Sequence, residues 1–188
     1  EQVAASNEQH GTAGPCPHKP VAERCLSCIL DSSDYFSGLT IQAKNALQLG
    51  MKRKHFGRKE MLYSNGKKSN HLYILLTGEI KVYKSLSDGR QQIHKLASIP
   101  GDLIACEDLF LDTYSSTAEA INEVSVCYIE KRHLQEASGS HGEIPDAMMR
   151  AMARHLNSYI RHIANLGNKN ALERVASYLV FLYETHQK

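Results

Sequence analysis

The sequence lacks long runs of apolar residues and lacks a strong net charge of either sign. No stretch approaches the roughly 20 apolar residues of a membrane-spanning helix, and residues 1–14 contain nothing like the apolar centre of a signal peptide. We therefore expect a cytoplasmic protein with no membrane partner. A formal net charge of +2 also gives no whole-chain basicity of the kind that indicates nucleic-acid binding.

Cysteine is scarce, and an odd count of five fits a disulfide framework poorly. Three of the five lie close together, at Cys16, Cys25 and Cys28. In a reducing cytosol such a group more often binds metal or performs redox chemistry than forms disulfides. The C-x-x-C pair lets a turn aim two thiolates at one metal, and prolines on both sides of Cys16 restrict the backbone there. The group predicts a metal centre that is one ligand short.

The rest of the chain predicts an α+β fold. Residues 1–34 are interpreted as a disordered tail followed by the cysteine-rich loop, because they are polar and carry no periodic pattern. A short amphipathic helix is predicted over residues 39–47, with Thr40 as its N-cap. Short strands without intervening helices follow and indicate an antiparallel sandwich or barrel, which we assign to residues 35–140. The clearest strands are residues 72–76, 79–83, 91–96 and 124–129.

The last quarter changes to a helical period. Its apolar residues alternate three and four apart, as in a coiled-coil seam: Met149, Met152, Leu156, Tyr159, Ile163 and Leu166. Pro145 suits the first turn of a helix, and Gly167 suits its end. We predict a dimerisation helix at residues 141–167, with a parallel two-fold seam over 145–166. A second helix, at about 171–185, is predicted within residues 168–188.

This order of parts resembles the CRP/FNR superfamily of bacterial transcription regulators. Residues 72–81 and the turn at 100–104 are similar to the superfamily, whereas Cys127, the N-terminal cysteines and residues 168–174 are similar to its FNR-like oxygen sensors. The resemblance covers about residues 16–188. It implies an antiparallel β-barrel or jelly roll of cyclic-nucleotide-binding type, followed by a long dimerisation helix. It also implies that residues 168–188 lead to a DNA-binding helix-turn-helix that is absent here.

The resemblance also implies a fourth ligand. Cys127 lies in the predicted strand 124–129, where a free cysteine is ordinarily a packing residue. The resemblance to FNR-like proteins implies that a 4Fe-4S cluster is held by Cys16, Cys25, Cys28 and Cys127. Four thiolates also suit an all-cysteine zinc site. Asp34 is a rival to Cys16 as a ligand, because many FNR-like proteins have a cysteine six residues after their C-x-x-C pair.

The predicted function is the sensor region of an FNR-like transcription regulator, in which an oxygen-labile iron-sulfur cluster controls dimerisation and hence DNA binding. The expected partners are a second copy of the chain and, for the full-length protein, promoter DNA and RNA polymerase. In the seam, Tyr159 occupies a position where FNR-like relatives often carry an acid. We therefore expect Tyr159 to face its symmetry mate and the chain to dimerise even without its cluster.

An alternative is a regulatory module that binds a cyclic nucleotide or another small ligand without a cluster. The usual phosphate-binding Arg position falls near Ser116, and Glu107 and Asp108 would repel a phosphate, so we expect no useful affinity for cyclic AMP.

A thiol-disulfide enzyme is a third possibility, but Cys25 and Cys28 lack the strand-to-helix context of such motifs. No catalytic set is visible, so no enzyme is expected. Cys106 is predicted to be a small buried residue.

Overall fold

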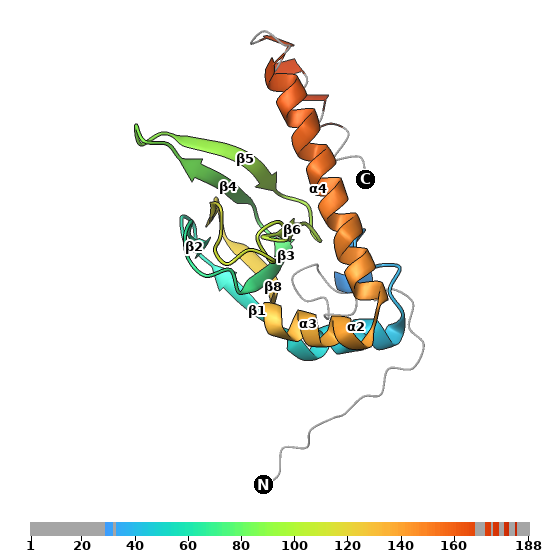
Figure 1. Ribbon diagram of the computed structural model, residues 1–188. Helices are drawn as coiled ribbons and strands as arrows, with labels where there is room; N and C mark the ends of the chain where they lie inside the picture. Colours follow the sequence, from blue (N-terminus) through green and yellow to red (C-terminus); the bar gives the residue numbers. More distant parts are fainter. Residues whose placement is uncertain are drawn as a thin grey trace.

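The computed structural model describes residues 29–167 apart from residue 32, together with scattered positions between 172 and 183. Two four-stranded antiparallel sheets lie at the centre of this described part, with strand orders β1-β8-β3-β6 and β2-β7-β4-β5 (Figure 1). The strands are β1 (Met51–Phe56), β2 (Met61–Tyr63), β3 (His71–Thr77), β4 (Ile80–Ser85), β5 (Gln91–Ala97), β6 (Leu103–Ile104), β7 (Thr117–Ala120) and β8 (Val124–Glu130). The four clearest predicted strands are thus confirmed, as β3, β4, β5 and β8.

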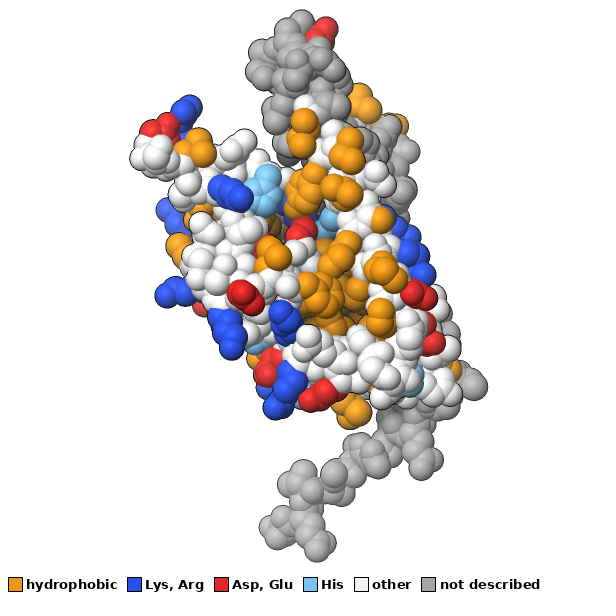
Figure 2. Space-filling model, in the orientation of Figure 1, with side chains coloured by type: hydrophobic (Ala, Val, Ile, Leu, Met, Phe, Trp, Pro, Cys, Tyr) orange, Lys and Arg blue, Asp and Glu red, His pale blue; other side chains and the backbone are white. Residues whose placement is uncertain are grey.

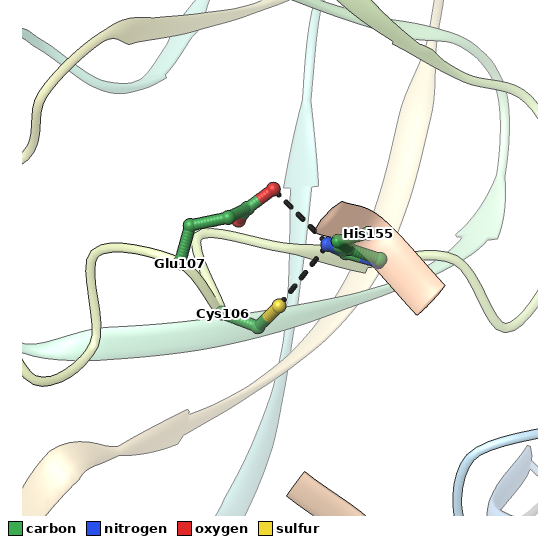
Figure 3. A group of neighbouring side chains, drawn as sticks. All are labelled: Cys106, Glu107 and His155. Carbon is green, nitrogen blue, oxygen red and sulfur yellow. Dashed lines mark hydrogen bonds and ion pairs between the residues drawn. The ribbon is translucent and has the colours of Figure 1, made fainter. Parts of the chain in front are cut away.

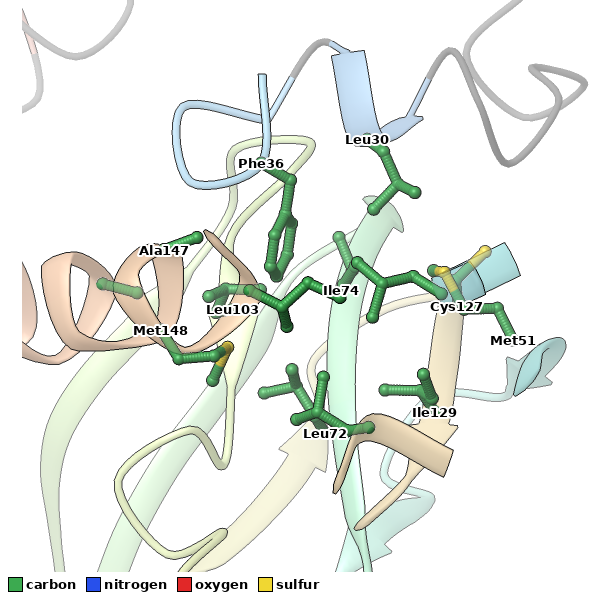
Figure 4. Packing of buried hydrophobic residues seen from close by; sticks show 14 of the residues in the cluster. Leu30, Phe36, Met51, Leu72, Ile74, Leu103, Cys127, Ile129, Ala147 and Met148 are labelled. Atoms are coloured by element: carbon green, nitrogen blue, oxygen red, sulfur yellow. The ribbon is translucent and has the colours of Figure 1, made fainter. Parts of the chain in front are cut away.

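The inner strands β3 and β8 are buried on both faces. Along β3, Leu72 and Ile74 pack toward the helices, whereas Tyr73 and Leu75 pack toward the second sheet. The same alternation in β8 sends Cys127 to the helical side and Val126 to the inside of the sandwich. A strand covered on both faces needs apolar residues at consecutive positions, which explains the continuous run in β3. Figure 4 shows the helical side of this core.

Three helices of the described residues flank the sheets: α2 (Ile41–Gly50), α3 (Lys131–Ser140) and α4 (Glu143–Gly167). The predicted helix at 39–47 is α2, and Thr40 caps it by accepting a hydrogen bond from the backbone N–H of Ala43. The predicted helix at 141–167 is α4, which runs along the side of the sandwich (Figure 1). None of the helices in the described segments could cross a membrane.

Helix α3 was not predicted. Its end reads as a turn because Ser138, Gly139 and Ser140 follow one another, and only Leu134 and Ala137 are buried in it. Contact with α2 stabilises it, and the approach is close because a Cβ on Gly50 would lie 2.7 Å from the Cβ of His133. The helix predicted at 171–185 lies largely outside the described residues, as do Cys16, Cys25 and Cys28.

Candidate functional site

Cys127, the predicted fourth ligand, lies in the middle of β8 with no exposed surface. It is one of two free cysteines among the described residues. Its neighbours across the sheet are Arg53 on β1 and Ile74 on β3. Burial raises the pKa of the Cys127 thiol to about 11, whereas the charge and hydrogen bond of Arg53 oppose that rise. The thiol is therefore a neutral core group at pH 7, next to a cation that favours its thiolate.

The first described residues reach the same core as Cys127. Ile29 and Leu30 are almost completely buried and belong to the hydrophobic cluster that contains Cys127 (Figure 4). Asp34, the rival ligand, is exposed in the turn that follows, and its backbone carbonyl accepts a hydrogen bond from Arg154. Of the two ligand candidates described, Cys127 alone is therefore a core residue.

A second group of reactive side chains lies where the sandwich meets α4 (Figure 3). Cys106 and Glu107 come from the loop after β6, and His155 comes from α4. The Nδ1 atom of His155 lies 3.1 Å from the Sγ of Cys106 and 3.0 Å from the Oε1 of Glu107. One atom from each residue can be chosen so that all three lie within 4.8 Å of one another. Cys106 is buried as predicted, but it is also part of a polar group.

Three further residues surround this group. The Nζ of Lys95 lies 3.5 Å from the Oε1 of Glu107 and 3.3 Å from the Nδ1 of His155. The Tyr159 hydroxyl donates to the same Glu107 oxygen at 2.6 Å. On the other side of the imidazole, the Tyr35 hydroxyl lies 3.3 Å from Nε2. His155 and Tyr159 are four residues apart, so they share the face of α4 that packs on the sandwich.

The electrostatics follow from burial and from these contacts. Burial alone would raise the pKa of Glu107, but the hydrogen bonds that it shares with His155 and Tyr159 and the charge of Lys95 hold it well below its usual range. Burial and the Glu107 charge raise the pKa of Tyr159, so this hydroxyl stays protonated and donates. Burial, with Asp102 adding to it, raises the pKa of Tyr35 to about 12. Glu107 is therefore a carboxylate at neutral pH.

A cavity of about 390 Å³ adjoins the group between the sandwich and α4. Glu107 and Asp108 line it, and so does Ser116, near which the position of a phosphate-binding Arg is expected from the sequence. Its wall also contains the basic side chains Lys84 and Lys95. The remaining lining includes Tyr63, His94, Ser115 and Tyr159.

The expectation that Tyr159 faces its symmetry mate is wrong, because its hydroxyl binds Glu107 of its own chain. The exposed face of α4 instead carries Ile160, together with Leu156 and Ile163. His155 was not among the residues singled out from the sequence. It stands one residue before the apolar seam residue Leu156. The signal for it is the spacing of His155 and Tyr159, which puts two polar groups on the buried side of an amphipathic helix.

Comparison with known proteins identifies the β-sandwich. The family described as "Cyclic nucleotide-binding domain" matches residues 53–141. These residues are a cyclic nucleotide-binding domain. The fold agrees, because the chain matches the structure of FixK2 from Bradyrhizobium japonicum with a TM-score of 0.65. The two chains are 30% identical over a match that covers 69% of this chain and 64% of FixK2.

The curated relatives of the chain are regulatory proteins of the CRP/FNR family rather than enzymes. The Fumarate and nitrate reduction regulatory protein of Vibrio cholerae is 28% identical over 181 residues, or 95% of this chain and 68% of the relative. The Nitrogen fixation regulation protein FixK of Azorhizobium caulinodans is 28% identical over 127 residues, or 68% of this chain and 50% of the relative. The matches thus span 50% and 68% of the length of these two relatives.

Proposed function

We propose that the chain is the sensor region of an FNR-like transcription regulator and that it holds an oxygen-labile 4Fe-4S cluster. The ligands are Cys16, Cys25, Cys28 and Cys127, with Asp34 as the rival to Cys16. One observation supports this ligand set most directly. Ile29, the residue after Cys28, is 3% exposed and belongs to the same core cluster as Cys127. The described part of the chain therefore starts inside the Cys127 core, one residue after the C-x-x-C pair in the sequence.

The residues present fit an iron-sulfur cluster. Four thiolates are the usual donors to such clusters, and Cys127 is a free thiol that is available as one of them. The Arg53 guanidinium next to it favours the thiolate form that ligation requires. A bound cluster would supply a redox-active centre that oxygen can oxidise. Ile29 and Leu30 would cover the adjoining core and anchor the loop to the sheet.

A physical connection between this core and α4 supports the proposed control of dimerisation. Ala147 and Met148, in the first turns of α4, belong to the same buried cluster as Cys127 (Figure 4). A change in the packing around Cys127 can therefore reach α4 through the residues of this cluster that lie between them. The opposite face of α4 carries the exposed residues Met149, Leu156, Ile160 and Ile163, which we assign to a homodimer seam.

The proposed organisation follows the chain. Residues 1–34 form the tail and cluster loop, 35–140 the sensor domain, 141–167 the dimerisation helix, and 168–188 the helix that leads to a DNA-binding domain. In the full-length protein, promoter DNA and RNA polymerase are the proposed partners. These assignments rest on the relationship to CRP/FNR regulators.

A small-ligand module without a cluster is the second candidate, and the cavity of about 390 Å³ favours it. Lys84 could attract an anion there, but Lys95 is already paired with Glu107 and donates to the Leu103 carbonyl at 2.6 Å. The acids Glu107 and Asp108 face the same space. We therefore expect calorimetry to detect no micromolar binding of cyclic AMP, and such binding would favour this second candidate.

The decisive experiment is to purify the chain without oxygen and to measure its absorption spectrum, iron and acid-labile sulfide. We expect a straw-brown protein with about four irons and four sulfides per chain, which bleaches in air. The substitutions Cys25→Ser, Cys28→Ser and Cys127→Ser should each abolish cluster retention. Cys106→Ser is the matched control, because it removes the other described cysteine and should leave the cluster in place.

Two outcomes separate the alternatives. A colourless anaerobic protein with stoichiometric zinc on the four cysteines would refute the iron-sulfur assignment. If Cys16→Ser retains a full cluster and Asp34→Ala loses it, Asp34 replaces Cys16 in the ligand set.

A further inference from the structure

The contacts around His155 exceed what one ring nitrogen can satisfy. Its Nδ1 lies 3.0 Å from the Glu107 carboxylate, an acceptor, and 3.3 Å from the Lys95 ammonium, a donor. If Nδ1 carries a proton, that proton satisfies Glu107 and faces Lys95. If Nδ1 carries a lone pair, it satisfies Lys95 and faces the carboxylate. The thiol of Cys106 adds a third contact at 3.1 Å. A metal cation bound between these residues would use the imidazole nitrogen, the carboxylate oxygen and the sulfur as its ligands.

The identity and separation of these atoms suit a metal ion. Sulfur, imidazole nitrogen and carboxylate oxygen are all zinc ligands, with bond lengths of about 2.0–2.3 Å. Tetrahedral bonds of that length would separate the imidazole nitrogen from the sulfur and from the oxygen by about 3.4–3.6 Å. The observed separations of 3.1 and 3.0 Å need only small side-chain adjustments to reach these values. Cys106 and His155 are also shielded from water, because they are 0% and 7% exposed.

The other side of the imidazole is also suited to metal binding. The Tyr35 oxygen lies 3.3 Å from Nε2 and can accept its proton, which leaves the Nδ1 lone pair for a metal. Metal-binding histidines usually have such a second hydrogen bond, because it fixes the tautomer and the ring orientation. Glu107 has a comparable support in the Tyr159 hydroxyl.

We propose that Cys106 Sγ, Glu107 Oε1 and His155 Nδ1 bind one divalent transition-metal ion of the zinc type. Three protein ligands leave a fourth position, which water or a small anionic ligand from the adjoining cavity would fill. The site shares no ligand with the proposed iron-sulfur cluster. Since two ligands come from the sandwich and one from α4, the ion would tie the dimerisation helix to the cyclic nucleotide-binding domain.

Lys95 is the competitor for this site. Its ammonium lies 3.5 Å from the Glu107 ligand atom and is held by the Leu103 carbonyl. A dication bound to Glu107 would be repelled by this charge, so Lys95 must weaken metal binding. If these residues form only a structural ion-pair network, removal of Lys95 would create no affinity for a metal. The substitution Lys95→Met therefore separates the two interpretations.

The test uses the full chain with Cys16, Cys25 and Cys28 changed to Ser, so that the N-terminal thiols cannot bind the probe. Metal-free, reduced protein is titrated with Co²⁺, and the bound ion is then displaced with Zn²⁺. We expect one Co²⁺ per chain with a thiolate-to-cobalt charge-transfer band. Lys95→Met should tighten binding at least about tenfold. Cys106→Ser should remove the band, and His155→Gln should weaken binding at least about a hundredfold.

Cys127→Ser in the same background is the matched control and should bind Co²⁺ with an unchanged spectrum. Circular dichroism of each metal-free variant shows whether it is folded, and Glu107→Asp provides a further ligand variant if Cys106→Ser does not fold. The proposal is overturned if the background protein and its Lys95→Met variant bind no Co²⁺ below millimolar concentrations, or if the band survives Cys106→Ser. Failure here would leave the iron-sulfur assay unaffected, because that assay depends on the N-terminal cysteines and Cys127.

Discussion

Glu107 holds the junction between the sandwich and α4 together. Its Oε1 accepts a hydrogen bond from the Tyr159 hydroxyl and lies close to both Lys95 and His155. A partly buried carboxylate is tolerated only when such partners replace its water. The free-energy contribution of Glu107 must therefore depend on its ionisation.

The first prediction concerns Glu107→Gln in metal-free protein. The pKa of Glu107 lies below its ordinary value of 4.5, so its contribution to stability is complete above that pH and is lost as pH falls toward the lowered pKa. We expect Glu107→Gln to lower the free energy of unfolding by about 2–3 kcal/mol at pH 7. The difference from the unmodified protein should shrink at pH 3.5. Urea unfolding at both pH values measures it, and a constant difference would contradict the prediction.

The exposed acid Glu136 provides the control for that experiment. It forms an i,i+4 pair with Arg132 on the surface of α3, and both side chains are well exposed. Glu136→Gln should change the free energy of unfolding by less than about 0.5 kcal/mol at either pH.

The second prediction concerns the turn between β3 and β4. Gly78 has a φ of +91°, and a Cβ there would lie 2.3 Å from the backbone oxygen of Glu123. Gly66 also has a positive φ, of +76°, but a Cβ there would meet nothing within 4 Å. We expect Gly78→Ala to cost about 3 kcal/mol or more and Gly66→Ala about 1 kcal/mol, as measured by urea unfolding. Equal costs would show that φ alone, and not the clash, sets the penalty.

At the scale of elements, the start of α2 and the start of α4 are joined through one residue. The Thr40 side chain caps α2 by accepting from Ala43, and the Thr40 backbone N–H and hydroxyl donate to the Glu143 carboxylate. These bonds hold the pKa of Glu143 below its usual range. The cap therefore serves both helices.

The third prediction follows from this double role. Thr40→Ala should lower the free energy of unfolding by about 1–2 kcal/mol, because the N-cap acceptor and the hydroxyl donor to Glu143 are lost together. Thr40→Ser retains the hydroxyl and should cost no more than about 0.5 kcal/mol. Thermal unfolding followed by circular dichroism compares the two. A cost for Thr40→Ser as large as that for Thr40→Ala would contradict the capping account.

At the scale of the whole molecule, α4 has two apolar faces. One face packs on the sandwich through Ile144, Ala147, Met148 and Ala151. The other is exposed, and hydrophobic side chains gather along it in Figure 2. A stripe of this kind on a long helix is typical of a coiled-coil seam, since burial against a second copy removes it from water.

The fourth prediction tests this seam. Leu156, Ile160 and Ile163 are 54–68% exposed and lie four and three residues apart. We expect the cluster-free chain to sediment as a dimer at tens of micromolar, and Ile160→Glu to shift it to a monomer, because two like charges would face each other across the two-fold axis. Asn157→Glu adds the same charge at a neighbouring exposed position of α4 and should leave the dimer intact. A chain that is monomeric both with and without its cluster would refute the seam.

The sequence by itself determined the elements whose signals are local. Strands β3, β4, β5 and β8, helix α2 with its Thr40 cap, and helix α4 were all predicted, because periodicity and turn residues act over a few neighbouring positions. Tertiary structure decided the rest. Helix α3 carries few apolar residues and depends on contact with α2. The direction of Tyr159 and the meeting of Cys106, Glu107 and His155 required α4 to pack against a loop about 50 positions earlier. A helix with two apolar faces does not specify from its period which face turns inward, and only the packed core makes that choice.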